Sequence, residues 1–201
     1  GLLCIGIYVG TVGLLRLFFL IDEELRACGK SDFHKKCLLY STVAGMILSR
    51  SIQEFSVKYL ISMMILGIYL IVCSITDELM CQVYDCMQYL GVLGAVLFLG
   101  HTNPQGTMGF SLILFGCIQY FLFMRMYGKA DGMGYCICAM YWTGMGRGME
   151  GYLYHMFLGF LMLVLVQVSG NNVTGGGRLK TPVPLYPYIS VSFLVLWSLS
   201  C

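Results

Sequence analysis

Apolar residues in this chain gather into long runs that are separated by short polar stretches. Eight such runs predict helices at residues 2–21, 37–49, 58–76, 87–100, 109–126, 132–146, 151–168 and 186–201. A helix needs roughly 20 apolar residues to cross the hydrocarbon core of a membrane. Several runs are shorter, and the run 37–49 reaches only ~20 Å as a helix. The pattern predicts an all-α polytopic membrane helix bundle with about eight (six to eight) transmembrane helices.

The composition excludes an ordinary soluble domain. Hydrophobic residues make up 58% of the chain and charged residues 11%, whereas soluble domains average about 25% charged residues. The formal net charge of +2 is too small to indicate a nucleic acid partner. The lipid bilayer is therefore the predicted surrounding of the bundle.

Glycine and cysteine are both frequent, and their positions predict helix packing rather than a metal site. The 25 glycines include several within the apolar runs, where small residues let helices approach closely. These are Gly91, Gly94, Gly116 and Gly144. The ten cysteines contain no Cys-x-x-Cys pair, and several lie inside apolar runs, where free cysteine acts as a small apolar residue. No metal or other cofactor is predicted.

The basic residues indicate which connections lie on the cytoplasmic side. Lys and Arg cluster in three connections, at residues 22–36, 125–129 and 170–183. Because positive residues favour the cytoplasmic side, these three are predicted there, with the N-terminus outside. Arg50 and Arg147 fall on the opposite side and count against this orientation.

Two aspartates, Asp77 and Asp131, stand next to apolar runs, and the charge rule places both at the cytoplasmic face. An ionisable residue at membrane depth is costly and is a functional hypothesis by default. Two facing carboxylates that share one proton can activate a water for peptide hydrolysis. Alternatively, both are ordinary carboxylates at helix ends, with Asp131 capping the helix that follows it.

The residues around the two aspartates carry a family resemblance. Asp77 is followed by ELMCQVYD, and Asp131 lies in GKADGM. The last apolar run follows a proline-rich stretch, with Pro182, Pro184 and Pro187. Together these resemble the type IV prepilin peptidases, which are GxGD-type intramembrane aspartic proteases related to the archaeal preflagellin peptidases.

The resemblance assigns roles to the motif residues. It makes Asp77 and Asp131 the catalytic pair and places Asp85 where the family has Asn or Asp after a proline. The supporting residues of the second motif are Gly128, Ala130 and Gly132, and those of the last helix are Pro184 and Pro187. The sequence departs from the pattern at Tyr84, which replaces that proline, and at Ala130, which replaces the second glycine. The added methyl group at Ala130 is expected to restrict the backbone where freedom is needed.

The resemblance also implies an organisation and an activity. Residues 1–57 would form the N-terminal span or spans with a short cytoplasmic loop, and residues 58–201 a six-helix peptidase core. The loop 22–36 is too short for the cysteine-rich methylation module of larger members. The expected enzyme is an aspartic endopeptidase of the inner (plasma) membrane. Its substrate would be a prepilin-like protein, with a short basic leader before a hydrophobic helix, cut at the cytoplasmic face.

Two further interpretations remain open at this point. Glu78 and Asp85 are candidates for binding the basic leader, although a solvated acidic turn is the simpler account. The rival function is a non-enzymatic polytopic membrane protein, either a proton-coupled transporter or a catalytically degenerate assembly factor. A transporter would be expected to show internal repeats and carboxylates near the middle of its spans, and neither is visible.

Overall fold

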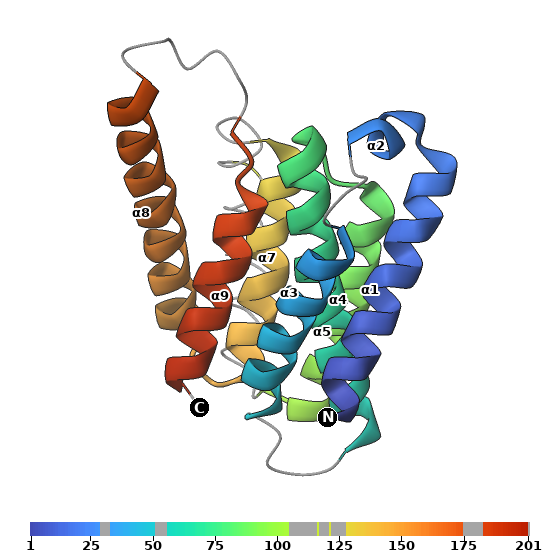
Figure 1. Ribbon diagram of the computed structural model, residues 1–201. Coiled ribbons are helices and arrows are strands. Elements are labelled where there is room, and N and C mark those ends of the chain that lie inside the picture. The colour runs from blue at the N-terminus through green and yellow to red at the C-terminus, as the bar shows by residue number, and fades with distance from the viewer. Residues whose placement is uncertain are drawn as a thin grey trace.

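The computed structural model describes residues 1–28, 33–50, 56–104, 116, 121, 128–174 and 183–200. Within these residues the chain is all α and contains no strand. The helices are α1 (Leu2–Ile21), α2 (Glu23–Cys28), α3 (Phe33–Ser49), α4 (Val57–Met80), α5 (Asp85–Thr102), α7 (Lys129–Gly144), α8 (Gly148–Thr174) and α9 (Tyr186–Ser200). The long helices lie side by side in a bundle (Figure 1).

Three helices are long and apolar enough to cross a membrane, namely α1, α4 and residues 148–169 of α8. The three helices differ in burial. Of the most apolar 18-residue stretch of each helix, 72% is buried inside the protein in α4, but only 22% in α1 and 22% in α8. The exposed side chains of α1 and α8 are largely hydrophobic, among them Ile5, Val9, Phe157 and Val164. An apolar outer surface is what a lipid environment requires.

Helix α4 occupies the centre of the bundle, where it packs against α1, α3, α5 and α9. Glycines allow the close approach, as the apolar runs predicted. A Cβ atom at Gly91 would lie 2.8 Å from Ile137 of α7, and one at Gly94 would lie 2.6 Å from Ile65 of α4. Gly144 is likewise crowded by Phe98. Gly116, by contrast, has no such neighbour among the described residues.

Aromatic side chains fill the space between α7, α8 and α9. The rings of Trp142 and Phe193 lie 5.1 Å apart, and those of Phe193 and Trp197 lie 5.2 Å apart. Stacked and tilted rings at such distances add to the stability that their burial alone gives. His155 of α8 is fully buried beside them, and its Nε2 lies 2.9 Å from the carbonyl oxygen of Ile189. This core fixes α9 against α7 and α8.

The predicted runs locate the described long helices but not all of their ends. The loop expected at 22–36 contains α2, so this prediction was wrong. Asp22 explains the helix, because its carboxylate accepts hydrogen bonds from the amides of Glu24 (3.0 Å) and Leu25 (3.2 Å), as an N-cap does. The predicted run 109–126 lies outside the described residues, apart from Gly116 and Phe121.

Candidate active site

Asp77 and Asp131 lie at the same end of the bundle. Asp77 belongs to the last turn of α4, which continues to Met80, and Asp131 is the third residue of α7. The C-terminal end of α4 and the N-terminal ends of α7 and α9 meet at this end (Figure 1). The fold thus places the two carboxylates that the sequence singled out at the same end of the bundle.

The carboxylate of Asp77 is held by the start of α9. It is only 6% exposed, and its Oδ2 accepts a hydrogen bond of 2.8 Å from the amide of Tyr186. The amide of Leu185 is directed at the same carboxylate. Pro184 and Pro187 flank these two residues. Because the first amides of a helix have no partner within it, they are available to an acceptor from another helix.

Gly128 shapes the turn before Asp131. Its φ angle of 105° lies in a region that side-chain-bearing residues rarely adopt, so glycine is required there. It is the N-cap of α7, and the amide of Gly132 donates to its carbonyl at 3.3 Å. A Cβ atom at Gly128 would lie 3.5 Å from Oδ2 of Asp131, so the carboxylate folds back over this glycine.

Ala130 does not need the freedom of glycine. It lies in the first turn of α7, and among the described residues the non-glycine positions with positive φ are Cys81 and Asn103. The expectation that the methyl group of Ala130 would restrict the backbone was therefore wrong, because a helical residue tolerates a Cβ atom.

Tyr84 stands where the proline was expected, and it contacts the end of α1 instead of ending α4. Helix α4 ends without proline, since Cys81 adopts the left-handed conformation at φ 52° and returns its amide to the carbonyl of Asp77 at 2.7 Å. Tyr84 donates a hydrogen bond of 2.6 Å to Oδ2 of Asp22, and its ring stacks on Phe18 at 4.3 Å. The turn after Asp77 is thereby tied to the end of α1.

This hydrogen bond changes the acidity of both partners. The Tyr84 hydroxyl, with the amides of Leu25 and Glu24, holds the pKa of Asp22 below its ordinary value of 3.8. The pKa of Tyr84 is raised, first by burial and then by its hydrogen bond to Asp22. The bond is charge-assisted and so stronger than one between neutral groups.

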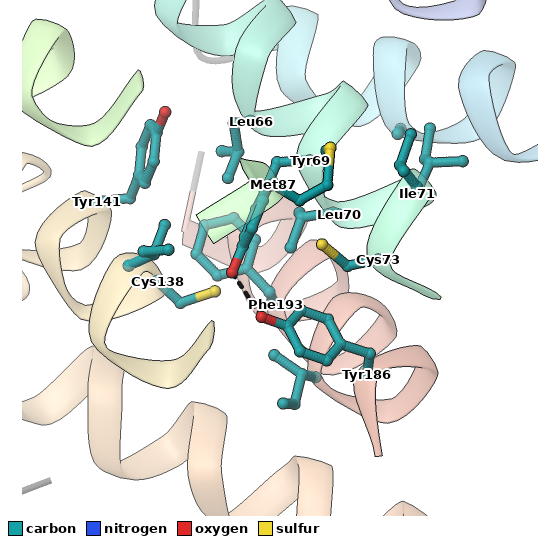
Figure 2. Close-up of a cluster of buried hydrophobic side chains, with 14 of the residues drawn as sticks. Leu66, Tyr69, Leu70, Ile71, Cys73, Met87, Cys138, Tyr141, Tyr186 and Phe193 are labelled. Carbon is teal, nitrogen blue, oxygen red and sulfur yellow. Dashed lines mark hydrogen bonds between the residues drawn. The ribbon is translucent and has the colours of Figure 1, made fainter. Parts of the chain in front are cut away.

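A buried polar network joins the four helices around the site. The hydroxyls of Tyr69 (α4) and Tyr186 (α9) lie 2.7 Å apart (Figure 2). Gln88 of α5 donates to Tyr186 at 2.8 Å and accepts from Tyr69 at 3.0 Å. The Tyr186 hydroxyl also lies 3.3 Å from the carbonyl oxygen of Ala130 in α7. The network reaches the residue directly before Asp131.

Sequence reasoning did not select Tyr69, Gln88 or Tyr186. A polar residue such as Gln88 inside an apolar run is a usable signal, because such residues are placed inward and paired. The two tyrosines gave no comparable signal, since tyrosine is frequent throughout the chain, with 14 residues. Their role depends on contacts between segments more than 100 residues apart, which no local pattern contains.

The two acidic candidates for leader binding lie on the same end of the bundle but differ in their surroundings. Glu78 forms an ion pair of 2.8 Å with Lys36 of α3, and both side chains are about 40% exposed. Asp85 is exposed in the first turn of α5. Glu78 is thus already engaged by a basic residue of this chain, whereas Asp85 faces solvent.

An apolar groove with a volume of about 290 Å³ lies between α3, α4 and α9. Its walls are mostly aliphatic, and Ser74, Glu78 and Pro187 lie at the end nearest the aspartates. The serine hydroxyls in the groove are satisfied, because Ser74 and Ser190 lie 2.7 Å apart and both reach the carbonyl of Leu70. The groove therefore offers apolar rather than hydrogen-bonding contacts.

In comparisons with known proteins, no family model, curated protein or solved structure matches this chain. Across the described ranges, no group of three or more His, Cys, Asp and Glu side chains is arranged to hold a metal ion.

Proposed function

We propose that the chain is an intramembrane aspartic endopeptidase. The proposal is supported above all by the position of Asp77 and Asp131 at the same end of the bundle, where Asp77 is almost fully buried. Neighbouring carboxylates that share a proton provide both the base and the acid that peptide hydrolysis needs. The resemblance of the surrounding motifs to the type IV prepilin peptidases supports the same reaction class.

The chemistry requires water and the two carboxyl groups only. The ionised aspartate takes a proton from the attacking water, and the protonated aspartate polarises the scissile carbonyl. As the carbon–nitrogen bond breaks, the leaving amine receives the proton. The site is half-closed, with Asp77 almost fully buried and Asp131 partly exposed, so water has access to one side of the pair.

The substrate we propose is a prepilin-like protein with a short basic leader before a hydrophobic helix. The apolar groove beside Glu78 supports this choice, because a hydrophobic segment needs such walls. The exposed carboxylate of Asp85 is free to face a basic leader in solvent. Glu78 would have to break its ion pair with Lys36 before it could bind the leader. We therefore propose that Glu78 contributes less to leader recognition than Asp85 does.

The proposal places the chain in the inner (plasma) membrane with six to eight spans. The three long apolar helices and the hydrophobic surfaces of α1 and α8 support membrane insertion. The basic connections in the sequence favour a cytoplasmic position for the aspartate end. A substrate whose leader is cytoplasmic and whose helix lies in the bilayer would meet the pair at the interface.

Cleavage of a purified prepilin-like substrate in detergent tests the proposal. The wild type should release the leader, and Asp77→Asn and Asp131→Asn should each abolish release. Glu150→Gln is the matched control, because this exposed carboxylate lies in the first turn of α8, at the opposite end of the bundle (Figure 1). It should cleave as the wild type does.

Equal inactivity of all four proteins on several prepilins would contradict the proposal. The same preparations would then be reconstituted in vesicles with a pH gradient. Proton flux that depends on Asp77 and Asp131 would favour a transporter, and its absence a degenerate assembly factor.

A further inference from the structure

The two aspartates have unequal hydrogen-bonding partners. Asp77 receives the amides of Leu185 and Tyr186 at the start of α9, the latter at 2.8 Å. Among the described residues, no group donates a hydrogen bond to the carboxylate of Asp131, which folds back over Gly128. Donors that point at a carboxylate favour its charged form.

The position of these donors strengthens the difference. They are the first amides of a helix, where the peptide dipoles present partial positive charge. Two neighbouring carboxyl groups do not both ionise readily, so one of them keeps a proton. The group with helix amides aimed at it holds the negative charge at lower free energy than the group without them.

We propose that the start of α9 assigns the catalytic roles, with Asp77 as the ionised general base and Asp131 as the protonated acid. The assignment of roles rests on the proposed function. Asp77 takes a proton from water while the water oxygen bonds to the scissile carbon, and Asp131 gives its proton to the carbonyl oxygen. Asp77 then protonates the departing amine, and Asp131 recovers a proton as the carbonyl re-forms and the carbon–nitrogen bond breaks. Both groups end as they began.

Tyr186 is the positioning residue in this arrangement. Its amide holds Asp77, and its hydroxyl lies 3.3 Å from the carbonyl oxygen of Ala130, the residue before Asp131. The Tyr186 hydroxyl lies 2.7 Å from the hydroxyl of Tyr69 (Figure 2). It also accepts a hydrogen bond of 2.8 Å from Gln88. One fully buried residue thus sets the distance between the helix ends that carry the two aspartates.

Infrared spectroscopy of the purified protein at neutral pH tests the assignment of charge. The wild type should show one protonated carboxyl band. Aspartate-to-glutamate variants keep both carboxyl groups, so Asp131→Glu should shift the frequency of this band and Asp77→Glu should leave it unchanged. The control Glu150→Gln, which changes an exposed carboxylate at the opposite end of the bundle, should keep the band. A band that shifts in Asp77→Glu and not in Asp131→Glu, or that is missing from the wild type, would overturn the assignment.

This measurement needs no substrate. Its failure is therefore distinguishable from failure of the proposed function, which is read from cleavage. A chain that cuts no prepilin but shows the expected bands would keep its assigned charges and lose its proposed reaction.

Steady-state cleavage tests the positioning role. Tyr186→Phe keeps the ring and the amide that holds Asp77 but removes the hydroxyl. It should lower kcat roughly tenfold to a hundredfold, because a small misplacement of catalytic groups has effects of that size, and leave KM within about twofold. Tyr188→Phe, two residues along the same helix, is the control and should behave as the wild type. An unchanged kcat in Tyr186→Phe, or an equal loss in Tyr188→Phe, would refute the role.

Discussion

Replacement of Gly134 by alanine should damage the site without touching an aspartate. Gly134 lies in α7 against Tyr186, and a Cβ atom there would be 2.7 Å from the hydroxyl oxygen and 2.9 Å from Cζ. Ordinary contact begins at 3.4 Å, so the ring would have to move by about 0.7 Å. Tyr186 is fully buried and hydrogen-bonded to Tyr69 and Gln88, and so has no free space to enter.

The size of the effect follows from the packing. Insertion of a methyl group into a filled core costs about 1–3 kcal/mol. Any glycine-to-alanine change within a helix also gains up to about 1 kcal/mol from propensity. Gly100→Ala isolates that gain, because Gly100 lies on the exposed side of α5, where a Cβ atom would have no neighbour within 4 Å among the described residues. The two variants should therefore differ by about 1–3 kcal/mol in free energy of unfolding.

Thermal unfolding in detergent, followed by circular dichroism, measures the difference. For a chain of this length each kcal/mol corresponds to ~2–4 °C in Tm. Gly134→Ala should also lose up to about 100-fold in cleavage rate, because displacement of Tyr186 moves the carbonyl of Ala130 and the carboxylate of Asp77 apart. Gly134→Ala as stable and as active as Gly100→Ala would show that Tyr186 does not occupy this position against α7.

Three smaller perturbations test other contacts. Tyr84→Phe should lower the Tm at neutral pH. Because the pKa of Asp22 is lowered in the folded protein, the hydrogen bond from Tyr84 stabilises the fold at higher pH, and this stabilisation is lost as the pH falls below 3.8. The Tm values of wild type and Tyr84→Phe should therefore converge at low pH. A constant difference in Tm down to low pH would contradict this. Glu78→Gln should change the free energy of unfolding by less than about 1 kcal/mol in a denaturant titration, since both side chains of its ion pair with Lys36 are about 40% exposed to solvent. A greater loss would mean that the pair is desolvated. Ser190→Ala should cost about 0.6–1 kcal/mol in the same titration, as interhelical hydrogen bonds do, and no loss would argue against its bond to Ser74.

The sequence predicted the parts of this protein that depend on local patterns. Apolar runs located α1, α4 and α9, because burial in lipid or in the core requires continuous hydrophobicity. Asp77 and Asp131 were selected because a carboxylate next to such a run is costly and therefore unusual. The structure confirms that both lie at one end of the bundle, and the cytoplasmic side of that end stays a prediction.

Other parts depend on contacts that no local pattern encodes. The helix α2 arises from one capping aspartate in a segment rich in charge, which was interpreted as a loop. The departure at Ala130 looked harmful because the motif was considered without its backbone conformation, which is helical. Tyr186 was missed because its two roles, through its amide and its hydroxyl, exist only when α9 lies against α4 and α7.

The attachment of Asp77 to the start of α9 has a consequence for biosynthesis. Asp77 and Tyr186 are 109 residues apart, so the ribosome adds the second roughly 5–20 s after the first. During that interval α4 has no partner for its buried carboxylate. Asp77 acquires its final surroundings only when α9 packs against α4, so the proposed peptidase activity would begin only after synthesis has passed the last helix described here.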